Sequence, residues 1–75
     1  ARFEALRRWR LERARADSVP AFVVASDRTL EDIATLSPSS LDDLKLCYGI
    51  GPRKAEAYGS AILEVLRRAE VTNFG

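Results

Sequence analysis

Three prolines and two closely spaced glycines divide this chain into short segments, and their positions constrain the fold more than any other feature. Proline fixes φ and removes a backbone donor, so it is tolerated in the first turn of a helix and disrupts a helix interior. Pro20 and Pro38 therefore mark breaks, and Pro52 marks a helix start. Gly49 and Gly51 predict a tight turn just before that last helix.

The segments between these breaks carry apolar residues at helical spacing. In the first segment, Phe3, Leu6 and Trp9 fall on one side of a helix. Serines and acidic residues precede the later stripes, as is typical of helix N-termini. Gly59, inside the last stripe, predicts that another helix approaches closely there. We expect helical segments at residues 2–16, 21–25, 29–36, 41–47 and 52–70, with Leu44, Leu46 and Cys47 on the fourth.

A chain of 75 residues has room for one domain with one modest core. Its hydrophobic content of 47% and its charged content of 31% without single-sign blocks predict a folded chain. We therefore expect one all-α domain over residues 1–75, a compact orthogonal bundle of about five short helices, with residues 71–75 as a frayed tail. Because it has no long apolar run and no secretion signal, we expect an intracellular, cytoplasmic protein without a membrane partner.

The net charge of +1 hides a strong asymmetry along the chain. Residues 1–16 hold six arginines, residues 17–43 hold six acids against Arg28 alone, and residues 44–75 hold five basic side chains against three acids. Either the helices pack with complementary charge, or the two basic ends form one basic surface. Arg10 and Arg13 project near the apolar side of the first helix, so we expect acids of the middle segment to pair with them.

No catalytic or cofactor motif is present. The chain has no histidine for acid-base work, no phosphate-binding loop motif and no C-x-x-C pair, so we expect no catalytic residue, metal or cofactor. The acids Asp27, Glu31 and Asp32 are explained by the dipole at a helix start. Cys47 lies in an apolar context and is interpreted as a buried structural thiol.

The stretch around the two glycines is the best candidate for a ligand site. A hairpin at Gly49 and Gly51 leaves backbone N–H groups uncovered, and the following helix directs its positive end to the same place. Arg53 and Lys54 would strengthen a phosphate site there. The alternative is a purely structural turn in which Ile50 fills the core, and the residues alone do not separate the two.

Five motifs in chain order then give the sequence a family resemblance. They are Phe3-x-x-Leu6-Arg7-x-Trp9-Arg10, Val19-Pro20-Ala21-Phe22-Val23-Val24, Ser26-Asp27-x-Thr29-Leu30, Ser39-Ser40-Leu41-x-x-Leu44 and Gly49-Ile50-Gly51-Pro52-Arg53-Lys54. With these motifs the chain resembles the helicase-and-RNase-D C-terminal domain, HRDC, along nearly its whole length. The resemblance implies a five-helix accessory domain of RecQ-type or UvrD-like helicases or of RNase D exonucleases, with catalysis in other domains.

The resemblance also implies binding to single-stranded or branched DNA, or contacts with partner domains. Where family members often have Pro-Pro-Tyr, this chain has Pro20-Ala21-Phe22, which keeps an aromatic ring for stacking and loses the hydroxyl. We also weigh Phe22 as a core residue, and favour that interpretation, because phenylalanine is usually buried.

We expect a non-catalytic accessory domain of an ATP-dependent DNA helicase, most like RecQ and associated with the bacterial nucleoid, that modulates the choice of DNA substrate through weak contacts. The candidate DNA-binding residues are Gly49, Gly51, Arg53, Lys54 and Phe22. The alternative is a module that docks on the helicase catalytic core of its own chain, with Arg28, Glu31 and Asp32 as candidate contacts. An accessory domain of RNase D is a third possibility.

Overall fold

The structure is a computed structural model that describes the backbone of residues 1–74 and the side chains of residues 1–70. These residues form helices and no strand. The helices are α1 (Arg2–Asp17), α2 (Ala21–Val24), α3 (Asp27–Leu36), α4 (Leu41–Leu44) and α5 (Pro52–Phe74). The all-α prediction is confirmed, and α5 begins at Pro52 as expected. The helical backbone continues through Phe74, whereas the side chains of residues 71–75 lie outside the described residues, so the frayed tail stays a prediction.

Local capping explains where the helices begin and end. α1 stops at Ser18, which takes a left-handed conformation with φ 56° and precedes the break at Pro20. α3 begins at Ser26, whose hydroxyl accepts a hydrogen bond from the Thr29 N–H group at 3.2 Å. The corresponding bond at α4 runs from the Asp43 N–H group to the Ser40 hydroxyl at 3.1 Å. Such caps satisfy N–H groups that have no partner within the helix.

The fourth helix is shorter than expected. α4 is one turn that ends at Leu44, because the amides of Leu46 and Cys47 turn back to carbonyls only three residues away. This tighter winding places Cys47 in the core and leaves Leu46 78% exposed. The prediction that this helix runs through Leu46 and Cys47 is therefore wrong.

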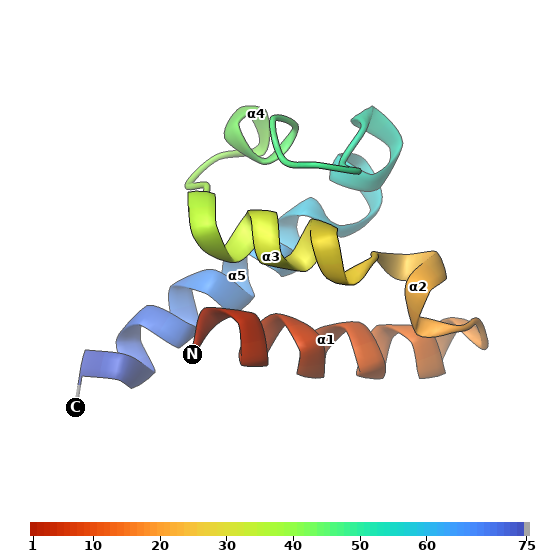
Figure 1. Ribbon diagram of the computed structural model, residues 1–75, viewed down its shortest axis with the longest axis horizontal. Coiled ribbons are helices and arrows are strands. Elements are labelled where there is room, and N and C mark those ends of the chain that lie inside the picture. Colours follow the sequence, from red (N-terminus) through yellow and green to blue (C-terminus); the bar gives the residue numbers. More distant parts are fainter. Residues whose placement is uncertain (75) are drawn as a thin grey trace.

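The core lies where α1, α3 and α5 meet. α1 packs on α2, α3 and α5, and α4 packs on α5. Figure 1 shows α1 along one edge of the molecule, α4 and the following loop at the opposite edge, and α3 between them. The largest fully buried side chains are Leu6, Val24, Leu30, Ile33, Leu44 and Ile62.

Two of the sequence expectations about packing are met. A Cβ atom at Gly59 would collide with the end of the Leu41 side chain, so glycine lets α4 approach α5 closely. Arg10 donates to the Ala25 carbonyl at 3.1 Å and pairs with the Asp27 carboxylate at 2.8 Å. Arg13 pairs with Asp17 at 3.1 Å. Acids of the middle segment thus pair with both arginines.

Replacing Leu6 with alanine tests the position of this core. Leu6 is fully buried, and Leu11 on the same helix is 47% exposed. We expect Leu6→Ala to lower the free energy of unfolding by about 2–5 kcal/mol, because it leaves a cavity. Leu11→Ala, the matched control, should change it by less than about 1 kcal/mol. Urea denaturation followed by circular dichroism measures both, and equal effects would contradict this packing.

Candidate nucleic-acid interface

The candidate interface is built on the hairpin, which we define as residues 45–51 between α4 and α5. Gly49 has φ +78°, a conformation that side-chain-bearing residues rarely adopt. A Cβ atom there would also lie 2.5 Å from the hydroxyl oxygen of the buried Thr29. Gly51 is different, because no atom lies within 4 Å of where its Cβ would be. Gly49 is therefore needed for the fold, whereas Gly51 keeps one side of the backbone open.

Internal hydrogen bonds hold the hairpin on the domain. The Ile50 N–H group donates to the Cys47 carbonyl at 3.1 Å, and the Ile50 side chain is buried. The Tyr48 N–H group donates to the Asp32 carboxylate at 2.7 Å. Ile50 thus fills the core, as the structural interpretation of the turn predicts. This anchoring does not exclude a ligand, because it uses only part of the hairpin backbone.

The remaining N–H groups at this corner point to an anion site. The first N–H groups of a helix have no partner within that helix. In α5 the first backbone hydrogen bond runs from the Ala55 N–H group to the Gly51 carbonyl, at 2.9 Å. Within residues 1–70, the amides of Gly49, Gly51, Arg53 and Lys54 have no protein acceptor. These four amides belong to one stretch of six residues.

The side chains of Arg53 and Lys54 add positive charge to that corner. Arg53 is exposed and Lys54 is half-buried. Neither forms an ion pair with any side chain that the structure describes, Glu56 included. The negative charge of Asp32 disfavours an anion here. Its carboxylate accepts a hydrogen bond from the Tyr48 N–H group.

Two of the candidate interdomain residues on α3 contact Tyr48 of the hairpin. Arg28 and Asp32 lie four residues apart, on one face of α3. The Arg28 guanidinium carbon lies 4.2 Å from the centre of the Tyr48 ring, while Asp32 accepts the Tyr48 N–H group. The sequence placed Asp32 at a helix start and among the candidate interdomain contacts, and the structure adds this bond to the hairpin. Of the three proposed interdomain residues, Glu31 has no such contact with the hairpin among the described residues.

The aromatic candidate Phe22 lies on α2 and is 72% exposed. The interpretation of Phe22 as a core residue is therefore wrong, and the ring is open to stacking. In the view of Figure 1, α2 and the first turn of α5 lie toward the same end of the long axis.

Sequence reasoning missed two other exposed side chains, Leu46 and Tyr48, on the hairpin itself. Tyr48 is 50% exposed although its ring is covered on one side by Arg28. The available signal was an aromatic residue directly before a glycine turn, in a segment too short to bury it. Cys47 between them is buried, as predicted, and burial raises the pKa of its thiol, with smaller contributions from the negative charges of Asp32 and Asp43.

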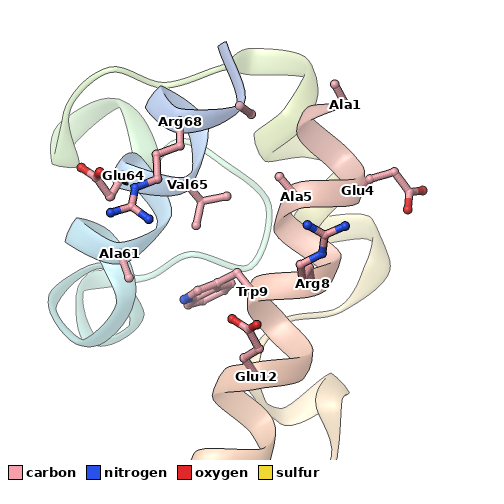
Figure 2. A pocket seen from close by; sticks show the side chains of 11 residues that line it. Ala1, Glu4, Ala5, Arg8, Trp9, Glu12, Ala61, Glu64, Val65 and Arg68 are labelled. Atoms are coloured by element: carbon pink, nitrogen blue, oxygen red, sulfur yellow. Dashed lines mark hydrogen bonds and ion pairs between the residues drawn. The ribbon is translucent and has the colours of Figure 1, made fainter. Parts of the chain in front are cut away.

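Apart from the hairpin, the surface has a hollow between α1 and α5. It has a volume of about 570 Å³, and Figure 2 shows Trp9 from α1 and Val65 from α5 on either side of it. Acidic and basic side chains alternate around it: Glu4, Arg8, Glu12, Glu64 and Arg68. Hydrogen bonds from Arg67 and Arg68 lower the pKa of Glu64, which stays charged. Because acids predominate, this hollow is a poorer phosphate site than the hairpin.

Comparisons with known proteins agree with this fold. The family model described as HRDC domain matches residues 1–66. The ATP-dependent DNA helicase UvrD2 of Mycobacterium tuberculosis is 47% identical over 62 residues, which are 83% of this chain and 9% of that helicase. The ATP-dependent DNA helicase RecQ of Bacillus subtilis is 38% identical over 65 residues, or 87% of this chain and 11% of that one. The chain spans only about a tenth of these relatives.

A solved structure shares the whole arrangement of helices. The structure of D. radiodurans RecQ HRDC domain 3 matches with a TM-score of 0.86 at 37% sequence identity. The match covers 89% of this chain and 88% of that one, so the order and packing of the helices are common to both.

Replacing each hairpin glycine with alanine tests their separate roles. We expect Gly49→Ala to lower the free energy of unfolding by about 1–2 kcal/mol from backbone strain alone, and further through the collision with Thr29. Gly51→Ala, the matched control, should change stability by less than about 0.5 kcal/mol, because its position is open. Urea denaturation measures both values. Equal destabilisation would mean that the hairpin does not rest on Thr29.

Proposed function

Because the chain belongs to the HRDC domain family, we propose that it is a non-catalytic accessory domain of an ATP-dependent DNA helicase and binds single-stranded or branched DNA weakly. The observation that carries the proposal is the corner at the start of α5. There, amides without a protein acceptor lie in the same six-residue stretch as two cations, whose side chains have no acidic partner in the described part of the chain. Backbone N–H groups and cations together are suited to phosphate oxygens.

The relatives support a DNA helicase as the parent enzyme. UvrD2 and RecQ are both DNA helicases by name, and this chain covers a small part of each. We therefore favour a helicase over an RNase D exonuclease as the parent. The ring of Phe22 would add a stacking contact to the phosphate contacts, which is how single strands are held without sequence preference.

Docking on the helicase core of the same chain remains the second candidate function. The exposed carboxylate of Glu31 favours it, because no contact within residues 1–70 explains that charge. Glu31→Lys is the appropriate probe in the full-length parent. Charge reversal at Asp32 would be ambiguous, since it would also remove the bond that holds Tyr48.

The dependence of binding on salt tests the phosphate contacts. For single-stranded DNA, log affinity should fall with log salt concentration with a slope of about −0.7 for each phosphate contact. We expect the double substitution Arg53→Ala and Lys54→Ala to make the slope shallower by about 1.4, because about two contacts disappear. Fluorescence anisotropy of a labelled oligonucleotide, from low to physiological salt, measures this slope.

The matched control removes the same charge elsewhere. Arg67 and Arg68 both pair with Glu64 on the distal part of α5. Replacing these two arginines with alanine lowers the net charge equally but should leave the slope nearly unchanged. If both double variants flatten the slope alike, binding reflects overall charge and not the hairpin corner. If the chain binds no DNA even at low salt, the docking function becomes the better explanation.

A further inference from the structure

We propose that Tyr48 is a stacking platform for an unpaired nucleobase, so that the hairpin selects single-stranded nucleic acid. This inference rests on the proposed function and deepens it, because it assigns the base-binding part of the same site. It starts from the exposure of Tyr48, half of whose surface is open to solvent on a hairpin that buries Ile50 and Cys47.

Two contacts from α3 hold Tyr48 in place. Its N–H group donates to the Asp32 carboxylate at 2.7 Å, which fixes the backbone. The Arg28 guanidinium lies over its ring at 4.2 Å, which orients the side chain. An aromatic ring that is both exposed and already fixed loses little conformational freedom when a flat ligand stacks on it. This distinguishes Tyr48 from Leu46, which is more exposed and has no comparable contact among the described residues.

The surrounding charge indicates which flat ligand fits. Tyr48 directly precedes Gly49, and the uncovered amides and the cations Arg53 and Lys54 follow within six residues. A ligand that fills both parts must carry an anionic group next to an aromatic one. A nucleotide has this composition, and every base has a face that can stack. In a duplex the bases stack on one another, so only an unpaired base is available to the ring.

The test separates the contribution of the bases to the binding affinity from that of the phosphates. Two labelled strands of equal length are used, one of thymidines and one in which the central nucleotides are abasic, so that the phosphates are nearly the same. We expect the 75-residue chain to bind the abasic strand between about fivefold and about a hundredfold more weakly at low salt, the range for one stacked base. Tyr48→Ala should lose affinity for the thymidine strand by a similar factor, and should keep only the part of the preference for bases that stacking on Phe22 supplies.

Two variants control for indirect effects. Tyr48→Phe keeps the ring and should retain the preference for the strand with bases. Leu46→Ala removes another exposed apolar side chain of the hairpin and should change affinity for either strand less than twofold. Thermal unfolding followed by circular dichroism checks that each variant is folded. Loss of affinity for both strands in Tyr48→Ala would overturn the platform, because it would show that Tyr48 only supports the hairpin.

The failure of this inference differs from the failure of the proposed function. If Tyr48→Ala binds the thymidine strand as tightly as the unmodified chain does, while Arg53→Ala with Lys54→Ala still flattens the salt slope, the platform is rejected and phosphate binding stands. If the unmodified chain binds neither strand at low salt, the proposed function fails and the platform fails with it.

Discussion

The close approach of the Gly49 backbone to the Thr29 hydroxyl places the hairpin against α3, and the candidate site is built on this hairpin. Thr29 belongs to the first turn of α3, and its hydroxyl hydrogen-bonds with that of the capping residue Ser26 at 3.0 Å. The cap that starts α3 therefore also fixes the surface on which the hairpin backbone rests. Only glycine fits that surface without strain. The next residue, Ile50, is buried in the core, and α5 begins at Pro52.

The charge asymmetry along the chain is largely resolved within the domain. Asp17 and Asp27 pair with arginines of α1, and Asp42 lies 3.9 Å from Lys45. Asp32 accepts the Tyr48 N–H group instead of a cation. Among the described residues, the ion pair of Asp27 with Arg10 links two helices, whereas those of Asp17 and Asp42 are local. The cations at the start of α5 remain available for a partner, which favours DNA over an acid-mediated docking surface.

Most of the fold was predictable because it depends on local sequence. The candidate site was only partly predictable because it depends on contacts between residues that are far apart in the sequence. Proline, serine caps and apolar stripes act over a few residues, and they predicted the order of the helices and the start of α5 at Pro52. The exposure of Leu46 could not be predicted from helical periodicity, because α4 is followed by tighter turns in which that periodicity does not apply. The positions of Asp32 and Arg28 against Tyr48 join residues that are 16 and 20 positions apart. No local pattern contains that pairing.

Weak binding is compatible with the proposed function of the domain. The hairpin corner offers a few amides, two cations and one or two exposed rings, which is too little surface for tight binding. In the proposed helicase, the domain would be tethered to a core that holds the DNA and would meet the strand at an effective concentration on the order of millimolar. Under this proposal, the domain would bias which strand the enzyme retains without anchoring it, because a tighter hairpin site would oppose translocation.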